Sequence, residues 1–255
     1  MRRAERILAP LAFAALVVAA WWAVAAWTGV PDSSLPTPGQ VATALADERS
    51  LLASAAAVTL GEIAVGLLLA VVLGVLVGVP VAGSRLAAHA VYPWLVASQM
   101  VPVPAIAPIV VLWAGFGIWP KVIVIALVSF FPIAVATIDG LRATDPDLLD
   151  LLRSLGAGRR DRLRIARIPA ALPQLFSGLK VATALAVIGA VFAEWVGSAD
   201  GLGYLMLSFN NQAAAAELFA AIAVLSVTGV ALVGAVAAAE RLLLPWYHGA
   251  RAPER

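Results

Sequence analysis

The chain has 255 residues, a formal net charge of +2 and a composition that is 62% hydrophobic and only 13% charged. Soluble domains are about 45–50% apolar and about 25% charged, so this composition excludes an ordinary soluble globular protein. Cysteine is absent and the two histidines, His89 and His248, lie far apart, which excludes a disulfide framework and the usual zinc patterns. We therefore expect no metal site.

The first apolar run covers residues 7–27 and follows a basic N-terminal segment. A cleaved signal peptide begins in the same way, but this run is longer than the apolar part of such peptides and has no obvious cleavage site before Pro31. We therefore predict a retained membrane helix. The prolines and charges of residues 30–50 predict an external segment with a short polar helix, so that residues 1–50 form the N-terminal part.

Five further apolar runs are long enough to cross a bilayer, which requires about 20 helical residues. They cover approximately residues 51–83, 90–114, 120–139, 174–197 and 213–239. Three glycines in the first of these runs would allow a neighbouring helix to approach closely: Gly66, Gly74 and Gly78. Three prolines fall inside the second run, where they would break the helix beside a neighbour or a water-filled cavity: Pro102, Pro104 and Pro108.

The basic residues orient these six predicted spans. With the N-terminus inside, only Arg49 and Lys121 of the 17 Lys and Arg residues lie outside. Such an excess of positive charge on the cytoplasmic side is the usual arrangement in membrane proteins. An odd number of spans would place the Arg-rich loop at 141–173 and the basic tail at 246–255 on opposite sides, so the charges favour six spans and two cytoplasmic termini.

The Arg-rich loop has the pattern of two helices joined by a turn. Asp147 lies near the start of the first helix, where an acidic side chain is favourable, and Gly156 follows this helix in the position of a C-terminal cap. Leucines at helical spacing give the helix one apolar face: Leu148, Leu151, Leu152 and Leu155. This face either docks into the groove of a partner or packs on the chain's own helices while the arginines contact anionic lipid, and the pattern alone leaves both open.

The same loop resembles the cytoplasmic EAA loop of bacterial ABC importer permeases. The resemblance lies in segment 150–157, Asp-Leu-Leu-Arg-Ser-Leu-Gly-Ala, and in Pro169, thirteen residues after the glycine. The chain departs from the family pattern in two places. The triplet 150–152, Asp-Leu-Leu, replaces Glu-Ala-Ala, and Ala166 replaces an aliphatic residue ten positions after the glycine. These departures affect the docking contacts more than the resemblance to the family.

Motifs outside the loop extend the resemblance over the chain from about residue 35 onward. Some of them are similar to permeases of the nitrate, sulfonate and taurine type: 112–117, 130–132, 140–142, 145–146 and 201–204. Others most resemble permeases for thiamine-pyrimidine precursors: 178–180, 186–190 and 194–197. The resemblance therefore favours a hydroxymethylpyrimidine-like solute, with aliphatic sulfonate, taurine or nitrate as the alternative.

The resemblance implies an all-α permease of the type I ABC importer fold in the bacterial inner membrane, with its core at residues 51–245. Such an importer combines two permease subunits with two cytoplasmic ATPases and an external substrate-binding protein. We expect the two permease subunits to form a homodimer, and we expect no nucleic acid among the partners. The chain has no Gly-x-x-x-x-Gly-Lys-Ser/Thr loop, so we expect no cofactor in this chain and ATP in the ATPase partner. The loop would present these residues to the ATPase: Asp147, Leu148, Asp150, Leu151, Leu152, Arg153, Ser154, Leu155, Gly156, Ala157, Arg159 and Pro169.

Glu62 and Glu194 are the acidic residues most clearly inside apolar runs, and ionisable groups at that depth are energetically costly. They either line the solute pathway near its outer end or pair with neighbouring groups that hold helices together. A carboxylate lining suits a neutral or cationic heterocycle better than a sulfonate, because like charges repel. Further residues are candidates for the pathway, although such polar groups also occur at helix interfaces and in loops: Ser98, Gln99, Pro102 and Asn210.

Two other classes of membrane protein fit the sequence less well. A stand-alone secondary transporter would have inverted repeats and an ion site at the membrane midplane, and the sequence has no internal repeat. A membrane enzyme would bring a nucleophile, a base and an orienting group together, and no loop does so. We therefore predict a transport subunit rather than an enzyme.

Overall fold

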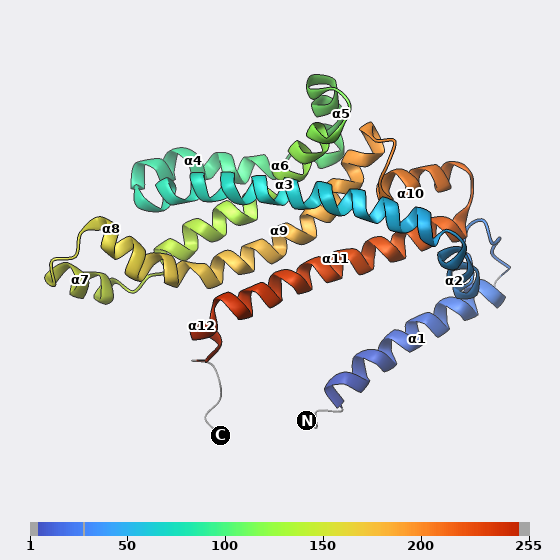
Figure 1. Ribbon diagram of the computed structural model, residues 1–255, viewed down its shortest axis with the longest axis horizontal. Coiled ribbons are helices and arrows are strands. Elements are labelled where there is room, and N and C mark those ends of the chain that lie inside the picture. The colour runs from blue at the N-terminus through green and yellow to red at the C-terminus, as the bar shows by residue number, and fades with distance from the viewer. Residues whose placement is uncertain (1–4, 28, 250–255) are drawn as a thin grey trace. The chain divides into compact units, whose positions relative to one another are not determined.

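The computed structural model describes residues 5–27 and 29–249, and within these ranges the chain forms only helices and turns (Figure 1). The first half contains α1 (Glu5–Trp27), α2 (Pro38–Asp47), α3 (Arg49–Gly83), α4 (Arg85–Ser98), α5 (Val103–Ala114) and α6 (Ile118–Arg142). The second half contains α7 (Pro146–Ser154), α8 (Arg159–Arg162), the π-helical turn η1 (Leu163–Arg167), α9 (Ile168–Gly197), α10 (Leu202–Asn211), α11 (Ala215–Leu243) and α12 (Pro245–Gly249). The all-α class predicted from the sequence is confirmed.

The helices form two compact units. Unit 1 contains residues 1–58 and 200–226, and unit 2 contains residues 59–199 and 227–255. Helices α3 and α11 each contribute one part to each unit. The division that the sequence predicts at residues 50 and 245 stays a prediction.

Unit 1 packs α2 against parts of α3, α10 and α11. Its core consists of buried aliphatic side chains from these four helices: Val41, Ala44, Leu52, Ala55, Leu202, Leu205, Ala220 and Ala221. Trp21 of α1 joins this unit, since its ring stacks on Phe219 and its Nε1 donates a hydrogen bond to the carbonyl of Pro36 at 3.0 Å. The predicted short polar helix is confirmed as α2, which begins at Thr37 with a capping box completed by Gln40.

Unit 2 packs around α6, which contacts α3, α4, α5 and α9. Buried apolar side chains form small clusters along it. One cluster joins Ile63 of α3 to Ile125 of α6 and Ala186 of α9, and another joins Val81 of α3 to Ile138 of α6. Figure 1 shows α6 and α9 running side by side, and these two helices make an extensive contact. The polar residues that α6 carries are therefore held in fixed positions between its neighbours.

Glycines bring α3 and α6 into close contact, as the sequence predicts. A Cβ atom placed on Gly74 would lie 2.7 Å from Cγ2 of Ile133, and Gly66 and Gly78 approach α6 in the same way. Real Cβ atoms do not come this close to their neighbours, so even a single methyl group has no room at these positions. The three glycines are required by packing rather than by backbone conformation.

We expect Gly74→Ala to lower the free energy of unfolding by about 1–3 kcal/mol, because the new methyl group must displace Ile133 and the α6 backbone. Gly61 lies on the same helix, and a Cβ atom there would have nothing within 4 Å. Gly61→Ala is therefore the matched control, and it should leave the stability unchanged or slightly higher. Denaturation of the purified full chain in mixed micelles measures both changes, and equal effects would contradict the close packing.

The third predicted span is interrupted, as its prolines predict, and the structure divides it into two helices. α4 and α5 meet at an angle of 99° across residues 99–102. Of the three prolines, only Pro102 lies in this break. Pro102 is the N-cap residue of α5 and Pro104 lies in its first turn, where a missing backbone N–H breaks no helical hydrogen bond. Pro108 lies in the interior of α5.

Four helical segments of the described chain are long and apolar enough to cross a membrane: Arg49–Gly83, Ile118–Arg142, Arg159–Gly197 and Ala215–Leu243. The bent pair of α4 and α5 adds a fifth if it is counted as one span. The apolar part of α1, Ala12–Trp27, is shorter than these. The chain therefore has several candidate spans in the predicted places, and the total of six with two cytoplasmic termini stays a prediction.

Candidate functional site

The predicted coupling loop contains a helix with its own start signal. α7 begins after Asp145, whose carboxylate accepts a hydrogen bond from the backbone N–H of Asp147 at 2.9 Å. Pro146 occupies the first helical position, which suits a residue without an N–H group. Asp147 lies in the first turn, where its negative charge is favourable. The first helix predicted in this loop is confirmed.

Gly156 ends α7 in a left-handed turn. Its φ is +83°. The backbone N–H of Gly156 donates to the carbonyl of Arg153 at 3.1 Å, and that of Ala157 donates to the carbonyl of Leu152 at 2.9 Å. These two hydrogen bonds form a Schellman motif, which satisfies carbonyl groups that the end of a helix would leave free. The C-terminal cap predicted at Gly156 is confirmed.

The leucine face of α7 is not covered by the described part of the chain. The exposed fraction is 43% for Leu148, 56% for Leu151 and 74% for Leu155, and Leu152 is half-buried. Large apolar side chains exposed together on one short helix indicate a contact surface. The alternative in which this face packs on the chain's own helices therefore finds no support among the residues that the structure describes.

The polar side chains of α7 also remain on the surface. Arg153 and Asp150 form an exposed ion pair at 2.7 Å, which contributes little to stability. The hydroxyl of Ser154 donates back to the carbonyl of Leu151 at 2.8 Å. These groups have few contacts within the chain, so they remain accessible to a partner that covers the leucines.

The second half of the loop is helical as well. The N–H of Gly158 donates to the carboxylate of Asp161 at 3.0 Å and starts this helix. From Arg159 the helical segment continues through α8, η1 and α9 to Gly197, with Pro169 in the first turn of α9. The helix-turn-helix pattern is confirmed, and the predicted span at 174–197 is the C-terminal part of a longer helical segment.

Glu62 lies buried between three helices. It forms an ion pair with Lys121 in the first turn of α6, and Nζ of Lys121 also donates to Oγ of Ser198, directly after α9, at 2.9 Å. Glu62 is 3% exposed and Lys121 is 7% exposed. The second carboxylate oxygen of Glu62, Oε2, has no hydrogen-bond partner among the described residues.

Glu194 joins the same cluster from α9. Its Oε1 accepts a hydrogen bond from Oγ1 of Thr59 at 2.7 Å, and both residues are fully buried. Thr59 lies one helical turn before Glu62, and Glu194 lies one turn before Ser198. We call these five residues the buried polar cluster: Thr59, Glu62, Lys121, Glu194 and Ser198. Its contacts join α3, α6 and α9, as expected for acids that hold helices together, and a role in the pathway stays a prediction.

The sequence identified the two acids of this cluster and missed their partners. Lys121 lies near the start of the span predicted at 120–139, and the structure places it in the first turn of α6, which begins at Ile118 directly after Gly117. The signal was Pro120, since proline is tolerated in the first turn of a helix. Thr59 and Ser198 carry no sequence signal that separates them from other hydroxyl groups in apolar helices.

A second ion pair, with a buried carboxylate and a partly exposed lysine, joins α9 to α11. Lys180 pairs with Glu240, which is 5% exposed. The structure thus gives Lys180 a partner on a neighbouring helix. Glu240 lies just beyond the apolar run that predicts the last span, but α11 continues to Leu243 and places this carboxylate against α9.

Ser98 and Gln99 line a cavity of about 430 Å³ between α4, α5 and α6. Its walls are mainly apolar and include Trp94 and Phe130. Small-molecule sites of about 300–1,000 Å³ with a few polar groups on apolar walls are common. Pro102 is not among the lining residues. The arrangement can hold a small ring compound and offer it a hydroxyl and an amide.

The remaining candidate belongs to the other unit. Asn210 is exposed near the end of α10 in unit 1, whereas the other candidates for the pathway belong to unit 2.

Within residues 5–27 and 29–249, no three His, Cys, Asp or Glu side chains gather in a group that could hold a metal ion.

Comparison with known proteins identifies similar membrane transport components. Residues 70–246 match the family described as the binding-protein-dependent transport system inner membrane component. The chain is 39% identical over 247 residues to the formylaminopyrimidine transport permease protein ThiX of Halalkalibacterium halodurans. This match covers 96% of this chain and 98% of that protein. It is also 30% identical over 237 residues to the putative aliphatic sulfonates transport permease protein SsuC of Bacillus subtilis. This second match covers 91% of this chain and 85% of that protein.

The fold is also similar to a solved structure. The match is a chain of the MetNI methionine ABC transporter in inward-facing conformations, with a TM-score of 0.57. The two chains are 19% identical, and the match covers 74% of this chain and 98% of the other. At this identity the likeness concerns the fold alone.

Proposed function

Since this chain belongs to the family of binding-protein-dependent transport system inner membrane components, we propose that it forms the solute pathway of an ATP-driven importer supplied by an external binding protein. Members of this family are transport components rather than enzymes, and the chain is a multi-pass permease subunit of the inner membrane. We further propose six spans with both termini in the cytoplasm. The distribution of basic residues supports this topology, because it leaves only Arg49 and Lys121 outside.

The observation that carries this function is the exposed leucine face of α7. We propose that it is a coupling helix seated in a groove of a separate cytoplasmic ATPase. The leucines supply the apolar contact, and the surrounding arginines orient the two proteins. Closure of the ATPases on ATP would move the docked helices as rigid bodies and turn the pathway outward. One chain provides one coupling helix, so we propose a homodimer on two ATPases.

The proposed solute is a pyrimidine precursor of thiamine. The name of the 39% identical relative supports it, as does the match over nearly the whole of both chains. The cavity beside Ser98 and Gln99 offers neutral hydrogen-bonding groups on apolar walls, which suits an uncharged ring. A sulfonate, taurine or nitrate is the alternative, supported by the 30% identical relative.

We expect labelled formylaminopyrimidine to enter cells that produce this chain together with the ATPase and binding protein encoded beside its gene. In a host without its own importer, uptake should exceed that of taurine by at least about tenfold, which corresponds to about 1.4 kcal/mol of discrimination. Replacement of the ATP-binding lysine of the ATPase is the matched control and should abolish uptake. A preference for taurine would overturn the proposed solute, and uptake without the ATPase would indicate a secondary transporter.

A further inference from the structure

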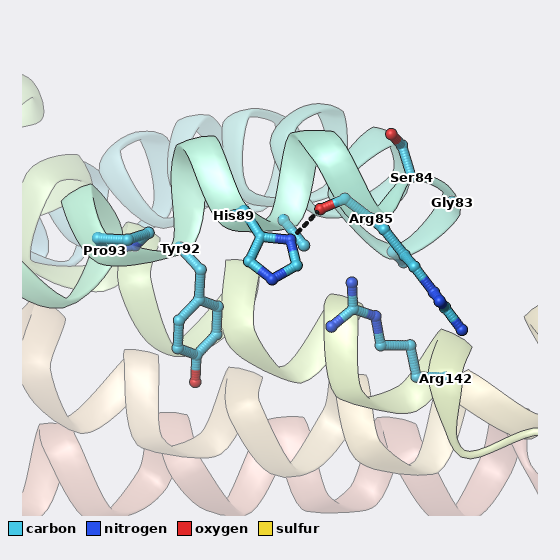
Figure 2. Close-up of a pocket in the computed structure, with 9 residues that line it drawn as sticks. Gly83, Ser84, Arg85, His89, Tyr92, Pro93 and Arg142 are labelled. Atoms are coloured by element: carbon cyan, nitrogen blue, oxygen red, sulfur yellow. Dashed lines mark hydrogen bonds between the residues drawn. The ribbon is translucent and has the colours of Figure 1, made fainter.

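The corner between α3 and α4 forms an open pocket of about 730 Å³ whose charged side chains are basic. Its polar side chains come from the start of α4 and the end of α6: Ser84, Arg85, His89, Tyr92 and Arg142. Figure 2 shows the His89 ring between Tyr92 and Arg142, with Arg85 extending past Arg142 on the other side. All these residues belong to unit 2, so their arrangement is fixed within one compact body.

No carboxylate balances the two guanidinium groups in this cavity. Aspartate and glutamate are missing from its lining, and no ion pair among the described residues involves Arg85 or Arg142. One Nη atom of Arg142 donates to the carbonyl of Val81 at 3.0 Å, which fixes this side chain and leaves its other donors free. Two like charges that line one cavity repel each other, and a bound anion would relieve this repulsion.

Of the neighbouring side chains, Tyr92 offers a further donor, whereas His89 already uses its N–H within the chain. Nδ1 of His89 lies 2.7 Å from the backbone carbonyl of Arg85. Because a carbonyl oxygen only accepts, Nδ1 carries the proton, and the ring is held in one orientation with Nε2 as its remaining polar atom. The hydroxyl of Tyr92 lies beside it in the lining. Guanidinium forks with a hydroxyl nearby are the groups that bind tetrahedral oxyanions.

A second cavity continues the basic surface. It has a volume of about 470 Å³ and shares Ala82 and Gly83 with the first. Its basic lining comes from the coupling loop: Arg153, Arg159, Arg162 and Arg167. The corner is therefore next to the loop, and the positive potentials of the two cavities reinforce each other there.

We propose that the corner between α3 and α4 binds the phosphate group of a phosphoester through Arg85 and Arg142. The cavity is much larger than one phosphate group, and its remaining walls are small or apolar, with Ala88 and Pro93 among them. The ligand is therefore a phosphate joined to an organic part, either a phospholipid headgroup or a soluble phosphate monoester. Neither the family nor the coupling function assigns this site.

The test uses the purified full chain in detergent and two pairs of probes. Native mass spectrometry compares retention of dioleoylphosphatidylglycerol with that of dioleoylglycerol, which has the same acyl chains and no phosphate. Thermal unfolding compares glycerol 3-phosphate with glycerol at equal ionic strength. We expect the phosphate-bearing member of at least one pair to bind, and R85Q/R142Q to weaken this binding by about tenfold or more. Retention of the phospholipid alone identifies a lipid site, and stabilisation by glycerol 3-phosphate identifies a soluble ligand.

Two further variants keep the test decisive. R85Q alone preserves the hydrogen bond from Arg142 to Val81, so it decides the question if the double variant fails to fold. R241Q removes an exposed arginine of α11 that lines neither cavity, and it should bind as the unaltered chain does. Equal binding of probes with and without phosphate, or equal binding by R85Q and the unaltered chain, overturns the proposal.

Discussion

Lys121→Met is expected to lower the free energy of unfolding by about 3–5 kcal/mol, because it leaves the carboxylate of Glu62 buried without its counter-charge. Glu62 is poorly placed to compensate, since its Oε2 already has no hydrogen-bond partner among the described residues. Ser198 would also lose the donor that reaches it from α6. Denaturation of the full chain in mixed micelles, followed by circular dichroism, measures the change.

The double variant Glu62→Met with Lys121→Met is the control for this effect. Replacing both members of a buried pair with apolar groups of similar volume removes the unpaired charge, so most of the lost stability should return. A double variant as unstable as Lys121→Met would mean that the single change acts through lost packing rather than through the charge. The interaction energy of this cycle measures the coupling between the two side chains directly.

Uptake by the same variants separates the two interpretations of Glu62. If the acid only joins α3 to α6, the double variant recovers uptake together with stability. If the carboxylate of Glu62 contacts the solute, the double variant recovers stability while its uptake stays low. Glu194→Gln provides a comparison within the cluster, because a glutamine keeps an oxygen that can accept the hydrogen bond from Thr59 and removes only the charge.

The positions of the helices were predictable because the length of an apolar run is a local property of the sequence. Each predicted apolar run falls mainly on helices, with a break at residues 99–102. The positions at which the helices begin and end were less predictable. α6 begins at Ile118, ahead of its predicted span, and the segment that starts at Arg159 continues into α9 without a stop. Hydropathy reports where apolar residues end, whereas a helix continues as long as its backbone hydrogen bonds do.

The two kinds of candidate site differ in how far the sequence could predict them. Both ends of α7 follow from residues beside them, since Asp145 and Gly156 act on their own backbone. The buried polar cluster depends on contacts between distant segments, and Thr59 and Glu194 are 135 positions apart. Which hydroxyl meets which acid depends on the rotation and spacing of packed helices, and a single sequence does not contain that information. The prolines likewise predicted a break between α4 and α5 but not its angle.

Gly156→Val is expected to reduce co-purification of the ATPase, and with it solute uptake, by about tenfold or more. A φ of +83° costs a residue with a Cβ about 1–2 kcal/mol, and a β-branched side chain more, so the Schellman motif should open. Nothing lies within 4 Å of a Cβ atom at this position, so the effect comes from the backbone and not from a clash. An opened turn no longer fixes the leucine face of α7 relative to the arginines that follow it.

Gly158→Val is the matched control, because the two glycines flank the same residue, Ala157, and are both exposed. Gly158 has a φ of −69°, which valine adopts without strain. Its Cβ atom would meet the Asp161 carboxylate at 3.4 Å, an ordinary contact distance. We therefore expect uptake within about twofold of the unaltered chain, since surface changes of this kind usually stay within about 0.5 kcal/mol. If Gly156→Val keeps full co-purification and uptake at normal expression, the rigid turn is not needed for coupling, and α7 is not the helix that carries the motion of the ATPase.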